Sequence, residues 1–73
     1  MNRLLALEHL AQAERHVAEG ERHIIEQRAR IAEAERGGLN TTIAKELLRT
    51  FEQTQALHLA DRERVRAELS ESG

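Results

Sequence analysis

Three of the four histidines in this chain recur at intervals of seven residues, as His9, His16 and His23. Histidine is a frequent ligand of transition metals and a frequent acid or base in catalysis. Along one helix, however, seven residues span two turns, about 10 Å, so one ion cannot bind two of these side chains at metal–nitrogen distances of about 2 Å. The column lies at the boundary between an apolar and a charged arc. This position predicts rings that pack along one edge and keep a nitrogen in water.

The fourth histidine, His58, lies near the centre of a helical face that is apolar at both ends. A helix that only fills a core carries leucine at such positions, so Thr54 and His58 predict a polar site in the middle of the face, with Asp61 and Arg62 at its edges. The face comprises Ile43, Leu47, Phe51, Thr54, His58, Val65 and Leu69.

If the helices are antiparallel, residues whose numbers sum to about 75–79 lie level with each other. Gly20 then lies opposite His58, and its small size leaves room for the imidazole ring. The expected polar layer contains Glu14, Glu21, His58, Asp61 and Arg62. In one interpretation, the layer fixes the register and oligomeric state of the helices.

In the other interpretation, the same layer binds a metal ion between helices. Dimetal bundles use glutamates together with a Glu-x-x-His motif, whereas the local motif here is His58-x-x-Asp61. The candidate metal ligands are Glu14, Glu21, His58 and Asp61.

Two helices must position these side chains. Residues 2–36 are rich in Ala, Glu, Arg and Leu, which favour helix. Gly37-Gly38 then supplies the left-handed conformation that ends a helix, and Asn40 or Thr41 can cap the next one. The sequence therefore predicts one all-α domain over residues 1–73, an antiparallel αα-hairpin with helices at 2–36 and 41–71 and a turn at 37–40.

The apolar residues of the first predicted helix also repeat every seven residues, a spacing typical of supercoiled helices. They cover about half of the helix circumference, more than one partner helix requires. Because a core this small is marginal by itself, we expect two hairpins to form a homodimeric four-helix bundle. The expected interface contains Leu10, Glu14, Val17, Gly20, Glu21, Ile24, Arg28 and Ile31.

One antiparallel arrangement accounts for the charges in that interface. A two-fold axis beside Glu21 pairs Glu14 with Arg28 of the partner subunit, twice by symmetry. The same axis lies close to Gly20, where the helices would approach most closely. The sequence thus predicts contact between the first helices of the two copies, and the rival prediction is contact through the second helices.

Composition excludes several classes of protein. The chain has no Cys, so disulfides and cysteine–metal sites are excluded. Its 11 basic and 13 acidic residues are mixed along both halves, without the basic cluster that phosphate binding requires. No apolar run approaches the length of a membrane span or a signal peptide. We therefore expect a cytoplasmic protein that does not enter a membrane, and the charge pattern makes nucleic acid a disfavoured partner.

The segments HLAQAERHVAEGERHI and LLRTFEQTQALHLADRERV, with the glycine-bearing turn, resemble a group of short, uncharacterised proteins of soil bacteria. The resemblance covers nearly the whole chain and implies a stand-alone two-helix protein, without an assigned activity. In architecture the chain is similar to the plasmid RNA-binding hairpin that dimerises into a four-helix bundle. It lacks that protein's exposed basic-aromatic face, because Phe51 is the one aromatic residue and is expected in the core.

These observations favour a small non-enzymatic interaction or adaptor protein that acts as a homo-oligomeric bundle, without a cofactor and with an unidentified protein partner besides itself. No nucleotide-binding loop, nucleophile elbow or catalytic triad is present in the sequence. The alternatives are a metal- or ligand-binding bundle that uses the His/carboxylate layer, and a nucleic-acid-binding hairpin dimer.

Overall fold

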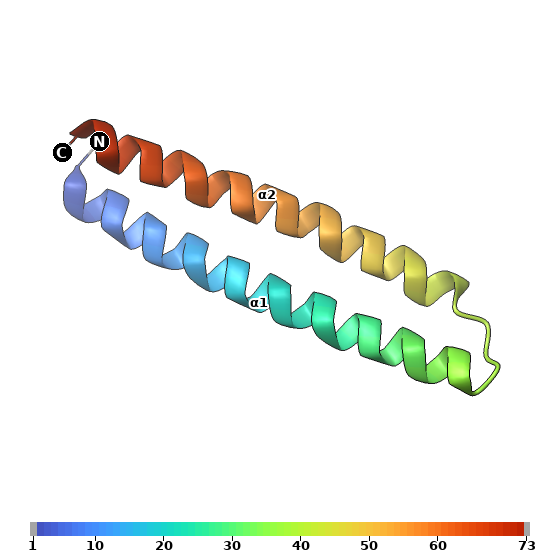
Figure 1. The fold of residues 1–73 in the computed structure, drawn as a ribbon. Helices are drawn as coiled ribbons and strands as arrows, with labels where there is room; N and C mark the ends of the chain where they lie inside the picture. Colours follow the sequence, from blue (N-terminus) through green and yellow to red (C-terminus); the bar gives the residue numbers. More distant parts are fainter. Residues whose placement is uncertain (1, 73) are drawn as a thin grey trace.

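Two long antiparallel helices lie side by side in the computed structural model, which describes residues 2–72 (Figure 1). α1 spans Arg3–Arg36 and α2 spans Thr42–Ser72, so the predicted all-helical hairpin is confirmed. Met1 and Gly73, the ends of the predicted domain, lie outside the described residues. The hairpin measures 54 × 14 × 13 Å, and the long extent corresponds to the length of one helix of 34 residues at about 1.5 Å per residue. Neither helix is both long and apolar enough, over the described residues, to cross a membrane.

Hydrogen bonds of specific side chains and glycines define the helix ends. Asn2 caps α1, because its Oδ1 accepts from the backbone nitrogens of Leu4 and Leu5 at 2.8 and 3.2 Å. At the other end Gly38 takes the predicted left-handed conformation, with φ of 73°. Leu39 N then donates to Ala34 O at 2.9 Å, which satisfies a carbonyl that the ending helix leaves unpaired.

The contact between the helices, which we call the seam, follows one seven-residue repeat on both. Apart from His16, Asp61 and Glu68, every described residue that is buried or half-buried belongs to it. On α1 the seam contains Ala6, Leu10, Ala13, Val17, Gly20, Ile24, Gln27, Ile31 and Ala34. Opposite α1 it contains Thr41, directly before α2, and the α2 residues Ala44, Leu48, Phe51, Gln55, His58, Arg62, Val65 and Leu69.

The predicted face of α2 was therefore partly wrong. Phe51, His58, Val65 and Leu69 lie in the seam, but Ile43 is 77% exposed and Leu47 and Thr54 are also exposed. Their places are taken by Ala44, Leu48 and Gln55, which continue the spacing of seven. The polar Gln55 is stable there because its Nε2 donates to Val17 O on α1 at 2.9 Å.

The hairpin has two long faces, one on each side of the seam. One, the ion-pair face, carries the cross-helix pairs Arg28–Glu52 and Lys45–Glu35, both at 3.2 Å. On α1 this face continues outward to an apolar outer column of Leu4, Ala11, Ala18, Ile25 and Ala32, all exposed. The other, the histidine face, carries His9, His16 and His23 beside the seam.

Candidate functional site: the histidine-lined groove

The three histidines of α1 lie over successive seam residues of α2. The ring centroids of His16 and His58 are 5.1 Å apart, and those of His23 and Phe51 are 5.7 Å apart. His9 lines a groove together with Val65, the seam residue seven positions after His58. The seven-residue repeat on α1 thus matches the seven-residue repeat on α2. Because the helices are antiparallel and of equal pitch, the numbers of two residues that meet add up to about 74. The rings cover the seam, as their boundary position predicts.

Only the middle histidine meets another histidine. His16 comes from α1 and His58 from α2, both rings are half-buried, and their planes are inclined by 44°. Beside them lies a small groove of about 80 Å³, whose wall also includes Glu19, His23, Phe51 and Thr54. A second groove, of about 270 Å³, continues along the same face past His16 and is lined by His9, Gln12, Asp61 and Arg64.

The predicted polar layer is not assembled within one chain. Glu14 and Glu21 belong to the column of Arg28, on the ion-pair face, and both are exposed. His58 instead packs against His16 near the histidine face. Of residues 2–72, no three His, Asp or Glu side chains are grouped so that they could hold one metal ion. The reason is the direction in which the side chains point from their helices. Glu14 and Glu21 flank the seam on the ion-pair face, whereas His58 packs toward the histidine face.

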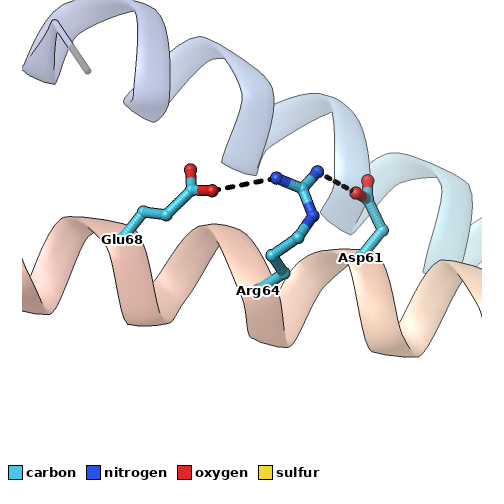
Figure 2. A network of polar contacts seen from close by, with 3 residues as sticks. All are labelled: Asp61, Arg64 and Glu68. Carbon is cyan, nitrogen blue, oxygen red and sulfur yellow. Dashed lines mark hydrogen bonds and ion pairs between the residues drawn. The ribbon is translucent and has the colours of Figure 1, made fainter.

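The remaining members of the predicted layer form contacts along α2 itself. Arg64 lies between two carboxylates, donating to Asp61 and, at 3.0 Å, to Glu68 (Figure 2). The hydrogen bond from Arg64 to Asp61, together with the charges of both carboxylates, raises the pKa of Arg64 above its ordinary value. Arg62 Nε lies 3.5 Å from Glu63 Oε1, the next residue along the chain. Asp61 thus serves a local ion-pair network at the edge of the groove.

Gly20 leaves room for Gln55, and not for His58 as the sequence suggested. A Cβ at residue 20 would lie 1.9 Å from Gln55 Oε1 and 2.8 Å from its Cδ. Because no packed structure tolerates such distances, the glycine is what allows this amide into the seam. His58 lies one turn further along α2, over His16.

The residues expected at a homodimer interface separate into two groups. The apolar members and Gly20 pack against α2 of the same chain, with Val17 and Ile31 buried and Leu10, Gly20 and Ile24 half-buried. Because α2 already covers this column in the hairpin, contact with a second copy there, with Gly20 beside the two-fold axis, would require α2 to move away. The charged members, Glu14, Glu21 and Arg28, remain exposed.

Sequence reasoning missed both buried glutamines. Gln27 Nε2 donates to Ala44 O at 3.0 Å, and Gln55 Nε2 donates to Val17 O at 2.9 Å, so each amide joins one helix to the backbone of the other. The signal was present in the spacing, because Gln27 lies in the column of Ala13, Gly20 and Ala34, and Gln55 lies in the column of Leu48 and Leu69. A polar residue on such a repeat indicates either exposure or a satisfied hydrogen bond, and only coordinates distinguish the two.

No protein-family model matches the chain, and comparison with curated proteins and with solved structures also gives no match.

Proposed function

We infer that this chain is a small non-enzymatic interaction protein whose working form is a homodimer, a four-helix bundle of two hairpins. The observation that carries this proposal is the small core of one hairpin. Its buried apolar residues are Ala6, Ala13, Val17, Ile31 and Val65, and two of these five are alanines with only a methyl group to pack. Outside the seam, large apolar side chains such as Leu4, Ile25 and Leu57 are exposed.

The large accessible surface of the hairpin supports contact with a second chain. The accessible area is 5356 Å² for a chain of 8.3 kDa. A compact monomer of this mass exposes about 4,600 Å², so the excess is about 800 Å². A specific protein–protein interface of ordinary size buries about 800 Å² on each side. The radius of gyration agrees, at 16.6 Å against about 11 Å for a compact domain of this length.

The outer column of α1, on the ion-pair face, is the surface that best fits a second copy. Its five members repeat every seven residues, and three of them are alanines, which let helix backbones approach closely. No residue of α2 covers this column, because it points about 100° away from the seam. Two such columns, packed antiparallel, would complete a bundle in which each α1 contacts its own α2 and the α1 of the other chain.

The charges beside the outer column select one register. If Ala18 faces its own copy, Glu14 meets Glu21 and Arg15 meets Arg22, four repulsive contacts. If the axis lies between residues 21 and 22, Ala18 meets Ile25 of the partner subunit. Glu14 then lies level with Arg28 of the partner subunit, and Glu8 with Arg36 of the partner subunit, each pair twice. Glu21 and Arg22 each approach their own copies at the rim, where water screens these two repulsions. Charge complementarity thus favours the second register.

The rival surface lies on α2, beside the histidine face. Ile43, Leu47 and Leu57 are exposed there, but Thr50, Thr54 and Arg64 interrupt them. This strip has neither a regular repeat of small residues nor complementary charges that a two-fold axis would bring together. This strip of α2 therefore serves as the alternative dimer interface in the experiment that follows.

Two substitutions distinguish the surfaces, Ile25→Glu and Leu57→Glu. The side chains are similarly exposed in the hairpin, 63% and 71%, and neither belongs to the seam. Sedimentation equilibrium with interference optics suits a chain without Trp or Tyr. The unsubstituted protein should have about twice the chain mass of 8.3 kDa. Ile25→Glu should weaken the dimer at least about a hundredfold, because burial of an unpaired carboxylate costs several kcal/mol.

Leu57→Glu should leave the dimer unchanged and serves as the control for the added charge. The opposite result, with loss of the dimer only in Leu57→Glu, would move the interface to α2. A folded monomer at tens of micromolar for the unsubstituted chain would refute the proposed function itself.

A further inference from the structure

His16 and His58 are the one place on the described chain where metal-binding side chains from both helices meet ring to ring. Their ring centroids lie 5.1 Å apart, with planes inclined by 44°. Two imidazoles that bind one tetrahedral ion, each through a nitrogen at about 2.0–2.1 Å, have centroids about 5 Å apart. The separation of the two rings therefore matches the spacing that a shared ion requires.

We propose that His16 and His58 form a site for a divalent transition-metal ion of the Zn²⁺, Ni²⁺ and Cu²⁺ class, bound between α1 and α2. Imidazole nitrogen is a ligand that these ions favour and that Mg²⁺ and Ca²⁺ do not. The site lies within one hairpin and on the face opposite the proposed dimer contact, so it does not depend on the oligomeric state.

The surroundings provide room for further ligands. The groove beside the two rings has a volume of about 80 Å³, enough for an ion with two or so water molecules at about 30 Å³ each. Glu19 lines the same groove, one turn after His16 on α1, and its side chain is exposed and free to rotate. Since no three ligand groups are already clustered among residues 2–72, the ion would be completed by water and by movement of the Glu19 carboxylate. That donor set, two imidazoles and one carboxylate, leaves positions open to an exchangeable ligand.

The other histidines provide internal controls. His9 and His23 occupy the same column as His16, two turns away on either side, so neither can share its ion. His23 has the same kind of ring contact as His16, at 5.7 Å, but its partner is the phenyl ring of Phe51, which has no ligand atom. The proposal therefore predicts one strong site at His16 and only weak, single-imidazole binding at His9 and His23.

Titration calorimetry with Zn²⁺, on protein without an affinity tag, measures this difference. One ion should bind per chain in the unsubstituted protein. His16→Gln and His58→Gln should each weaken binding by about a hundredfold, because a second ligand on the same scaffold acts at a high effective concentration. His23→Gln and His9→Gln should retain the affinity. Circular dichroism should establish that each variant remains helical.

A second measurement needs no substitution. A substoichiometric amount of Cu²⁺ broadens the NMR signals of the imidazole protons nearest to it, and the signals of His16 and His58 should broaden together and before those of His9 and His23. Equal broadening of all four histidines, or equal losses of Zn²⁺ affinity in all four variants, would show adventitious surface binding and overturn the proposal. Absence of Zn²⁺ binding to the unsubstituted protein would also overturn it.

Discussion

The ion-pair face and the histidine face flank the same seam and follow the same seven-residue repeat, but their cross-helix contacts are of opposite kinds. On the ion-pair face, Arg28 reaches Glu52 and Lys45 reaches Glu35, all through exposed side chains. On the histidine face, the half-buried ring of His16 lies against the ring of His58, and the exposed ring of His23 lies against the ring of Phe51. A position on one side of the seam is therefore chemically distinct from the equivalent position on the other.

The difference assigns separate roles to the two faces. Long charged side chains contribute little to hairpin stability at the surface, but they can choose the register of a second helix that packs beside them. Aromatic rings beside a seam shield it from water and border grooves in which a small ligand can bind. We therefore place the contact with a second copy on the ion-pair face and the metal on the histidine face.

Of the substitutions that test this difference between the two faces, a charge swap on the ion-pair face should have the largest effect. Glu14→Arg should weaken dimerisation about tenfold, and Arg28→Glu somewhat more, because it also removes the pair with Glu52. The double variant should recover most of the affinity, since the charges are exchanged across the two-fold axis. Sedimentation equilibrium measures all three dissociation constants.

Glu26→Arg is the control for that swap, because it changes the same charge about 100° around α1 from the outer column. It should leave the dimer intact. If the two single variants behave like Glu26→Arg, then Glu14 and Arg28 do not meet across a dimer axis and the proposed register is wrong.

The seam between the two faces should respond to a coupled pair of substitutions. Gly20→Ala gains about 1 kcal/mol of helix propensity. It also displaces the Gln55 amide from Val17 O, a loss of about 1 kcal/mol, so the net change should be close to zero. With Gln55→Ala already present, the same Gly20→Ala should stabilise the hairpin by about 1 kcal/mol.

Urea unfolding at one fixed protein concentration measures this cycle, since a dimer's stability depends on concentration. A coupling energy below about 0.3 kcal/mol would mean that Gln55 does not occupy the space above Gly20. Neither variant should alter the charge-dependent register of the dimer, because Gly20 and Gln55 lie in the seam and not on the ion-pair face.

The seam also shows what the sequence could predict. Helix propensities and the Gly37-Gly38 pair were sufficient for both helices and the turn, because these depend on local conformation. The rotation of α2 was missed because Ile43 and Leu47 are larger and more apolar than Ala44 and Gln55, so the apolar pattern alone favoured them. The choice depends on a hydrogen bond between residues 17 and 55, a tertiary contact that local sequence does not encode.

The candidate site was found in part for the same reason. The sequence identified His58 and the column of His9, His16 and His23, but it assigned carboxylates as partners of His58. Glu14 and Glu21 were expected near His58 because the apolar arc of α1 seemed to include them. In the structure the arc divides between the seam and the outer column, and the residue that reaches His58 is His16. The matched repeats of seven on the two helices contain this information once α2 has the right rotation.

The smallest expected effect tests whether the histidine face needs imidazole for stability or only a ring. His58→Phe would give His16 the kind of partner that His23 already has in Phe51. An aromatic pair contributes about 0.5–1.5 kcal/mol beyond its buried area, and the substitution exchanges one such pair for another. Stability in urea should therefore change by less than about 0.5 kcal/mol, while Zn²⁺ binding should be lost because phenyl has no ligand atom.

Phe51→His is the reciprocal variant, and it should create a second site of similar spacing with His23. A loss of more than about 2 kcal/mol in His58→Phe would mean that His58 makes a buried polar contact that a ring cannot replace. The two faces would then differ less than their contacts suggest, since both would depend on polar pairs across the seam.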